Sequence, residues 1–199
     1  MSFDPQPIVL EGRHVRLEPL TEHHRAEMRA RAEEAGAETF RWFINDGIAE
    51  PAAFDRWFDA ALEGSRRGTD LPWATIRRSD SRLVGSTRYL EIRRAHRALE
   101  IGNTWLIPEA RRTAINSESK YLQLCHAFDE LGATRVQLKT DARNETSRRA
   151  IARLGCVLEG VLRHYQTRDD GFVRDTVMFS LIAPDWPAAR ARLAAGVQG

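Results

Sequence analysis

The chain has 199 residues, with 30 Lys and Arg against 28 Asp and Glu, so its formal net charge at pH 7 is only +2. Apolar residues make up 42% and charged residues 29%, which excludes a disordered, collagen-like or disulfide-scaffold protein. A chain of this size buries roughly 70% of the surface that its unfolded form exposes, and a single core is the simplest arrangement. No stretch approaches the ~18 consecutive apolar residues of a membrane-spanning helix, and the N-terminus is neither basic nor apolar. We therefore expect a cytoplasmic protein with no membrane partner.

Arginine dominates the basic residues. Only Lys120 and Lys139 are lysine, so 28 of the 30 basic residues are arginine. The planar guanidinium binds phosphate oxygens bidentately, which makes phosphate recognition one interpretation. A codon bias that also enriches alanine is the other. Because proteins that bind nucleic acid show a strong basic excess, the balanced charge argues against nucleic acid as a partner.

The cysteines and histidines show no metal-binding pattern. Cys125 and Cys156 lie in apolar contexts, which is typical of small buried side chains in a reducing compartment. The spacing of the histidines does not indicate a zinc site. We therefore expect no disulfide and no bound metal.

The first third of the chain is expected to contain one strand and two helices. Residues 14–20 alternate between apolar and polar side chains, as a half-buried strand does. Thr21 caps a helix that runs to Ala35, and a second helix follows Pro51. The second helix is amphipathic, with apolar residues at helical spacing: Phe54, Trp57, Phe58, Ala61 and Leu62.

The middle of the chain is rich in strand signals. Three strands are expected, over residues 71–77, 82–92 and 98–106. Pro108 ends the third strand, because proline cannot donate to a ladder of hydrogen bonds. The best helix of the chain follows, with Asn116 as its expected cap and Gly132 as its end.

The remaining elements complete one sheet. A strand over 135–139, a helix over 144–154 and a hairpin of strands 157–167 and 172–182 follow in order. The order predicts an α+β fold: a single mixed, mostly antiparallel sheet with a central βαβ crossover and helices on both faces. The crossover makes strand 135–139 parallel to strand 98–106.

The junction between strand 98–106 and the long helix is the most informative stretch for function. A helix N-terminus offers unpaired N–H groups and a positive dipole end, and these suit an anion. Arg111 and Arg112 add two permanent charges just before the expected cap, Asn116. The alternative is a solvated loop with an ordinary helix cap.

Several features together resemble the Gcn5-related N-acetyltransferases (GNAT). They are the strand that ends at Trp105 and Leu106, the long helix that ends at residues 128–132, the strand at 136–140 and the segment 144–156. Residues 155–163 are most similar to the branch that acetylates ribosomal-protein N-termini. The resemblance covers residues 8–187 as one domain, with 1–7 and 188–199 as terminal extensions. It implies the acyl-CoA N-acyltransferase fold, acetyl-CoA as the donor and a primary amine as the acceptor.

The resemblance also assigns parts of the acetyl-CoA site. Backbone N–H groups near Leu106 and Ile107 would polarise the thioester and hold the oxyanion. The diphosphate would lie on the loop that contains Arg111, Arg112, Thr113, Ala114, Ile115 and Asn116. Ala114 and Asn116 replace the small hinge residues usual in the family, as in a sub-branch in which Asn116, Glu118 and Lys120 stand for the glycine pattern. Because glycine lets backbone approach a ligand closely, this loop must take a different path or bind diphosphate less intimately.

Asn144 and Ser147 lie in the first turn of the helix over 144–154. In the family, the matching Asn contacts the cofactor arm and the matching hydroxyl lies near the sulfur. Ser147 could therefore protonate the departing thiolate as a general acid. From the residues alone, a capping Asn144 with an incidental Ser147 is an equal alternative.

Two carboxylates are candidates for the general base that deprotonates the acceptor amine. Glu100 lies on the strand that leads to Leu106 and is the first candidate; Glu159 is the second. An exposed strand glutamate is the alternative reading of Glu100. The resemblance predicts a carboxylate where this chain has Gln166, whose amide cannot act as a base.

Two functions are carried forward from the sequence. The first is an N-acetyltransferase in which an amine, of a protein N-terminus or of a small molecule, attacks acetyl-CoA directly. The second is a catalytically silent acyl-CoA-binding or interaction module with the same fold, which the altered loop favours and Asn144 and Ser147 oppose. An exposed final strand could also pair across a homodimer.

Overall fold

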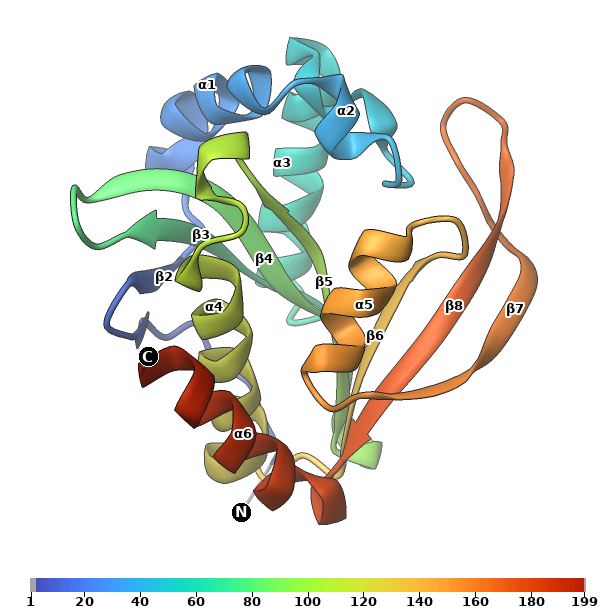
Figure 1. Ribbon diagram of the computed structural model, residues 1–199. Coiled ribbons are helices and arrows are strands. Elements are labelled where there is room, and N and C mark those ends of the chain that lie inside the picture. Colours follow the sequence, from blue (N-terminus) through green and yellow to red (C-terminus); the bar gives the residue numbers. More distant parts are fainter. Residues whose placement is uncertain (1–2, 199) are drawn as a thin grey trace.

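The computed structural model describes residues 3–198, which form one eight-stranded sheet with helices on both faces (Figure 1). The order of the strands across the sheet is β1-β2-β3-β4-β5-β6-β8-β7. The strands are β1 (Leu10–Glu11), β2 (Val15–Pro19), β3 (Leu71–Arg77), β4 (Arg82–Arg93), β5 (Ala98–Leu106), β6 (Arg135–Asp141), β7 (Val157–Thr167) and β8 (Val173–Ile182).

Six α-helices are described in this range, joined by short helical turns. The helices are α1 (Arg25–Ala35), α2 (Ala37–Phe40), α3 (Pro51–Arg66), α4 (Ala114–Cys125), α5 (Glu145–Arg153) and α6 (Trp186–Gln198). The 3-10 turn η2 (Asp46–Ala49) joins α2 to α3, and the π-helical turn η5 (His126–Glu130) extends α4. Within residues 3–198, no helix is long and apolar enough to cross a membrane.

The sheet is antiparallel except at one pair of strands. β5 and β6 run parallel, and α4 is the crossover between them, while every other neighbouring pair is antiparallel. The predicted mixed sheet and its central βαβ unit are therefore confirmed. Because β5 and β6 are parallel, the C-terminal ends of both strands lie at the same edge of the sheet.

Helices cover the two faces of the sheet in different places. α4, α5 and α6 lie on the near face of Figure 1, and α1 and α3 lie on the far face. Because side chains alternate along a strand, β4 serves both faces. Thr87 bonds to Lys120 of α4, and the next residue, Arg88, lies over Trp57 of α3.

Glu118 anchors α4 to the edge of the sheet. Its carboxylate accepts the backbone N–H groups of Arg13, His14 and Val15 at 2.7, 2.7 and 2.8 Å. A Cβ at Gly12 would lie 2.5 Å from this carboxyl group, so the turn needs glycine there. The buried Glu118 therefore joins the helix to the β1–β2 turn more than a hundred residues away.

The start of α4 differs from the prediction. The helix begins at Ala114, and its cap is Thr113, whose Oγ1 accepts the N–H of Ile115 at 3.3 Å. Asn116 lies inside the first turn, so its prediction as the cap was wrong. Both residues favour capping positions, and the backbone conformation of Thr113 decided between them. The predicted end holds, because Gly132 has φ +66°.

The packed domain extends beyond the predicted boundaries of 8–187. Phe3 is buried, and α6 includes most of 188–199 and packs against α4 through buried Trp186, Ala189 and Leu193. Residues 1, 2 and 199 of the predicted extensions lie outside the described part. The final strand also differs, since β8 lies inside the sheet between β6 and β7. The edge strands of the described sheet are β1 and β7, so the expectation that the last strand has a free edge for pairing across a dimer is wrong.

Candidate active site

The parallel strands at the centre of the sheet separate along their length. β5 pairs with β6 only from Ala98 to Glu100, which lie opposite Arg135 to Gln137. Beyond Glu100, this edge of β5 has no strand partner in the described sheet. α4 and α5 begin on the same face on either side of this opening (Figure 1). Unpaired backbone groups and two helix N-termini therefore meet at one place.

The loop before α4 takes its unusual path at an arginine. Arg112 has φ +59°, in the left-handed region that normally favours glycine. Its side chain is exposed and has no hydrogen bond or ion pair with any described residue. Arg112 therefore places an uncommitted guanidinium beside the N-terminus of α4.

Arg111 is used differently from its neighbour. Its Nε donates to the carbonyl of Leu106 at 3.0 Å, and its Nη2 bonds to the hydroxyl of Thr39. Burial lowers the pKa of this guanidinium. Arg111 thus ties the loop to the end of β5 and to α2, and Arg112 is the freer of the two predicted anion ligands.

The backbone near the end of β5 is only partly available. The N–H of Ile107 donates to the carbonyl of Val84 at 2.9 Å, so the expectation of a free N–H at Ile107 is wrong. Leu106 lies opposite Gly85, where a Cβ would meet the Trp105 carbonyl at 2.0 Å. This close approach keeps β4 against the end of β5, where the N–H of Ile107 is already hydrogen-bonded to β4.

The first turn of α5 confirms the predicted cap. Asn144 Oδ1 accepts the N–H of Ser147 at 3.1 Å. The hydroxyl of Ser147 is half-buried and has no partner among the described residues. The nearby Arg148 guanidinium donates to the carbonyl of Ala142 at 3.1 Å. The turn therefore presents hydroxyl groups, the half-buried one of Ser147 and the exposed one of Thr146, rather than a cluster of free cations.

Glu100 lies in a buried polar network and is only 1% exposed, so it is not an exposed strand residue. Its Oε2 lies 2.9 Å from Lys139 Nζ and accepts from Gln137 Nε2 at 3.1 Å. Burial raises the pKa of Glu100, and this effect is larger than the lowering of the pKa by the nearby Lys139. Burial alone would lower the pKa of Lys139, but attraction to Glu100 and Glu91 raises it. A carboxylate with a raised pKa is suited to accept a proton near neutral pH.

The second predicted base is already engaged. Glu159 forms two hydrogen bonds to Arg135, at 2.6 and 2.5 Å, and accepts from Ser180 at 2.8 Å. The Arg135 hydrogen bonds lower the pKa of Glu159 to about 2. Such a carboxylate is a poor proton acceptor, so Glu100 is the stronger of the two candidates. Gln166 lies near the end of β7, paired with Arg174 of β8.

A buried lysine on α4 is a feature that the sequence did not single out for chemistry. Lys120 Nζ lies 2.7 Å from Thr87 Oγ1, 2.6 Å from Thr104 Oγ1 and 3.1 Å from Gln123 Oε1. No carboxylate balances it among the described residues, and burial lowers its pKa to about 7. Lys120 thus joins α4 to β4 and to the free part of β5. Its place in the pattern with Asn116 and Glu118 was the signal available beforehand.

A cavity of about 460 Å³ lies on the opposite face of the sheet from α4. Its lining comes from α3, β4, β5, the segment between α2 and η2, and the β7–β8 loop. The lining residues are Asn45, Ala53, Arg56, Trp57, Ala60, Arg88, Asn103 and Asp169. Asn103 has φ +48° and lies on the part of β5 that has no partner strand on its β6 side. The cavity therefore meets the opening between β5 and β6 from the face that α3 covers.

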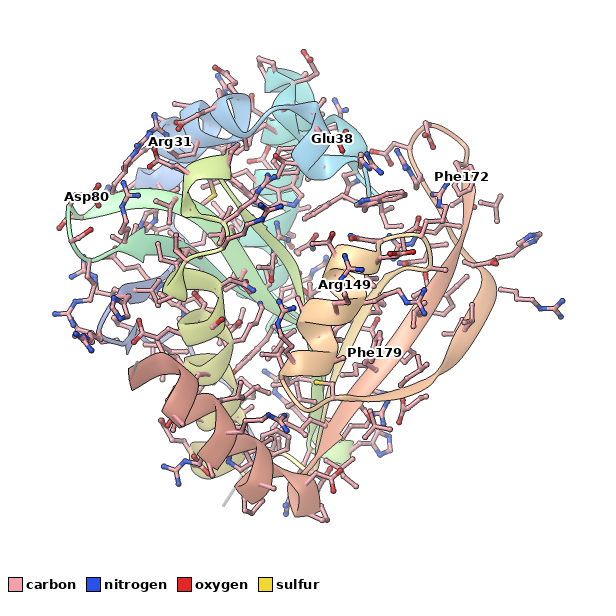
Figure 2. The ribbon with its side chains drawn as sticks, in the orientation of Figure 1. Arg31, Glu38, Asp80, Arg149, Phe172 and Phe179 are labelled. Carbon is pink, nitrogen blue, oxygen red and sulfur yellow. The ribbon has the colours of Figure 1, made fainter. Side chains whose placement is uncertain are left out.

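The β7–β8 loop and the segment after α2 close one side of this cavity. Asp169 donates its N–H to the carbonyl of Ile44 at 3.1 Å and accepts from Asn45 Nδ2 at 3.2 Å. Arg174 Nη1 donates to the carbonyl of Trp42 at 2.8 Å. Figure 2 shows Phe172 of the hairpin and Glu38 of α2 on the two sides of this junction. The hydrogen bonds hold two segments together that are more than 120 residues apart.

Trp57, which the sequence places on the apolar side of an amphipathic helix, is buried, but its neighbours at the cavity were not predicted. Arg88, Asn103 and Asp169 come from two strands and a turn that carry no shared motif. One signal was present, since Arg88 is a charged residue within the otherwise uncharged run 83–87 and 89–90. Local sequence could not predict that Arg88 and Asp169 line the same cavity, because the two residues are 81 positions apart and only the fold brings them to one place.

One group of possible metal ligands occurs among the described residues. Atoms of Glu18, His23 and His24 lie within 4.8 Å of one another. The ring of His24 is already used, since Nδ1 accepts the N–H of Thr21 at 3.2 Å and Nε2 lies 3.3 Å from Glu18. The Thr21 contact belongs to a capping box at the 3-10 turn Glu22–His24, which precedes α1, so both ring nitrogens of His24 are engaged by residues of the chain.

Comparison with known proteins agrees with this geometry. Residues 14–157 match the family described as the acetyltransferase (GNAT) domain. The chain belongs to the GNAT acetyltransferase family. It is therefore an acetyl-CoA-dependent acyltransferase, and the fold is that of the acyl-CoA N-acyltransferases.

Individual relatives support the same assignment. The uncharacterized N-acetyltransferase YoaA of Bacillus subtilis (strain 168) is 33% identical over 125 residues, which are 63% of this chain and 68% of that protein. A GCN5-related N-acetyltransferase from Brucella melitensis is 31% identical, with a TM-score of 0.89 over 98% of this chain and 87% of that one. RimJ of Mycobacterium smegmatis, solved with CoA-disulfide, is 22% identical with a TM-score of 0.77 over 92% of this chain and 88% of that one. This last likeness concerns the fold alone.

The buried Lys120 predicts a pH-dependent stability. Its pKa is about 7 in the folded chain, against the 10.5 of an ordinary lysine. Between these values the unfolded chain binds more protons than the folded one, so the free energy of unfolding rises with pH. Relative to Lys120→Met, the wild type should gain about 2 kcal/mol between pH 7 and pH 9 in urea denaturation. Parallel pH profiles of the two proteins would contradict the low pKa.

Proposed function

We propose that this acyltransferase moves the acetyl group of acetyl-CoA to the primary amine of a small molecule, by direct attack and without an acyl-enzyme. One observation carries the proposal. The opening between β5 and β6 has a free hydroxyl and two helix N-termini on one face and a 460 Å³ cavity on the other. Donor and acceptor can thus approach the same unpaired strand edge from opposite sides.

The near face suits the donor. Arg112 and the N–H groups at the start of α4 are placed to hold the diphosphate of acetyl-CoA. Thr113, Ala114, Ile115 and Asn116 form the first turn that presents these groups. Asn144 shapes the start of α5 and faces the same opening from the other side. The free edge of β5 before Leu106 supplies backbone donors for the acetyl oxygen, without Ile107.

The chemistry needs two proton transfers. The amine nitrogen attacks the thioester carbon to give a tetrahedral oxyanion, and the carbon–sulfur bond then breaks. We assign the proton that the amine loses to Glu100, directly or through a water, because its pKa is raised by burial. We assign the proton that the CoA thiolate gains to the hydroxyl of Ser147, which then regains a proton from water, while Glu100 releases its proton to water.

The cavity favours a small acceptor over the N-terminus of a folded protein. Its volume lies in the range of small-molecule sites. The bonds of Asp169 to the segment at Ile44 and Asn45 close one of its sides. The alternative of a silent acyl-CoA-binding module rested on the altered loop, and Arg112 provides a cation where that loop lacks glycine.

Arg112 is expected to contribute directly to acetyl-CoA binding. In Arg112→Ala, the dissociation constant should rise about 10- to 150-fold, because a charge-assisted hydrogen bond to phosphate contributes roughly 1.5–3 kcal/mol. Calorimetric titration with acetyl-CoA measures it. Arg97→Ala is a matched control, since Arg97 is also exposed and also has positive φ, at +47°, in the β4–β5 loop. Arg111→Ala combined with Arg112→Ala should weaken binding further, and an unchanged constant would remove both arginines from the site.

Ser147 is expected to act in the chemical step. Ser147→Ala should lower kcat about a hundredfold, the usual contribution of a general acid, and should leave acetyl-CoA affinity unchanged. Release of CoA thiol in the presence of an amine panel gives kcat. Thr146→Ala is the control, because Thr146 is the exposed neighbour in the same turn. If Ser147→Ala turns over every amine at the wild-type rate, the hydroxyl is not the acid.

Glu100 predicts an acid limb in the pH profile of kcat. Only the ionised carboxylate accepts a proton, so activity should fall as the pH drops through its raised pKa. Glu100→Gln should lower kcat about a hundredfold and remove that limb. Glu91→Gln tests the network alone, since exposed Glu91 shares Lys139 and Gln137 with Glu100. A profile that keeps its acid limb in Glu100→Gln would assign the base elsewhere.

A further inference from the structure

The cavity on the α3 face holds more positive than negative charge. Two guanidinium groups, of Arg56 and Arg88, line it, and Asp169 supplies one carboxylate. The remaining lining residues are uncharged. The lining thus carries a formal excess of one positive charge, in a region that is partly removed from water.

Arg88 is a buried cation with poorly satisfied donors. It is 3% exposed, and its guanidinium lies 4.3 Å from the centre of the Trp57 ring. A guanidinium has five N–H donors. Its contacts are long: 3.8 Å to Asp70 and 3.5 Å to the carbonyl of Trp57, while its Nε has no partner in the described structure. Burial lowers the pKa of Arg88 to about 10, and the same burial raises that of Asp70.

The aromatic wall beside Arg88 also lacks an acceptor. The indole N–H of Trp57 is buried and has no hydrogen-bond partner among residues 3–198. Buried donors in folded proteins are normally paired, and each unpaired one costs free energy. Two neighbouring residues that line one cavity, Arg88 and Trp57, therefore each have a buried N–H without an acceptor: Nε of Arg88 and Nε1 of Trp57.

Arg56 adds a second cation at the mouth of the cavity. It precedes Trp57 on α3 and is exposed. It has no hydrogen bond or ion pair with any described residue. Most other arginines near α3 are engaged, for example Arg25 and Arg29 with Asp55.

We propose that the acceptor of this enzyme is a small amine that also carries a carboxylate, and that Arg88 and Arg56 bind that carboxylate beside Trp57. The inference rests on the proposed function, since it takes the cavity as the acceptor site. A carboxylate matches the planar fork of a guanidinium, and it supplies acceptors for the buried N–H groups of Arg88 and Trp57 that have none. The volume of about 460 Å³ suits a molecule the size of an amino acid.

This arrangement separates the two ends of the acceptor. The carboxylate is held among Arg88, Trp57 and Arg56 on the α3 side. The amine is then directed toward Asn103 and the free edge of β5, where the acetyl group is transferred. Arg88 and Arg56 thereby determine specificity, and they take no part in the proton transfers.

The test compares acceptors that differ at one group, which is either a carboxylate or the corresponding carboxamide. Acetyl transfer is measured by CoA thiol release with a panel of amino acids and the carboxamide of each. For the acids that are turned over, KM should be at least tenfold lower than for their carboxamides. In Arg56→Ala this preference should fall about tenfold through KM, with little change in kcat or in the KM of the carboxamides.

Controls separate this inference from the proposed function and from misfolding. Arg66→Ala removes an arginine at the other end of α3 whose side chain is 72% exposed, and it should keep the preference. Arg88→Lys retains the buried charge without the fork and should also lose discrimination, whereas Arg88→Gln tests complete loss of the charge. Calorimetric titration of the CoA-saturated enzyme with the same acids and carboxamides gives a measurement that does not depend on turnover, because CoA carries no acetyl group to transfer. Equal affinity for both, or binding of neither, overturns the inference; transfer to no amine with preferential binding of acids would overturn only the proposed function.

Discussion

The separation of β5 from β6 after Glu100 is the constraint on which the rest of this structure depends. Parallel pairing covers only three residues of each strand, and β5 then continues with one edge unpaired. The register of β4 and β5 shifts between Ser86 and Arg88, and Asn103 adopts positive φ in the same region. Such bulges bend a strand and increase its twist. β5 therefore turns away from β6 while it stays paired with β4. A gap opens between β5 and β6, whereas the other neighbouring strands of the sheet stay paired.

A gap of this kind is stable only if neighbouring elements hold the two strands apart. α4 is fixed beside the gap by two buried ionisable side chains, those of Glu118 and Lys120. Glu118 binds the β1–β2 turn, and Lys120 binds Thr87 and Thr104 on β4 and β5. α4 is thus fastened to the sheet by two residues of the pattern Asn116, Glu118 and Lys120, namely Glu118 and Lys120. All three residues of this pattern lie inside α4, and its glutamate and lysine fix the helix to the sheet.

The arginines of this chain have several different roles. Many form exposed ion pairs, such as Arg66 with Glu63 and Arg149 with Glu145, which contribute little to stability. Arg111 fastens the loop to the end of β5, while Arg112 stays free beside α4. Arg88 is buried against Trp57 with unsatisfied donors. The excess of arginine over lysine therefore has a specific meaning only at the few positions that border the opening.

The sequence by itself determined the order of the elements, the mixed sheet with its parallel central pair, the cap at Asn144 and the family. Alternation, capping residues and turn signals are local properties, so they can be read within a few residues. Only the tertiary structure decided that Thr113 rather than Asn116 caps α4. It also decided that the N–H of Ile107 donates to the carbonyl of Val84 and that Glu159 forms an ion pair with Arg135. It also decided that Arg88, Asn103 and Asp169 share one cavity. Each of these depends on which distant groups compete for the same hydrogen bond or the same buried space, and that competition exists only once the chain has folded.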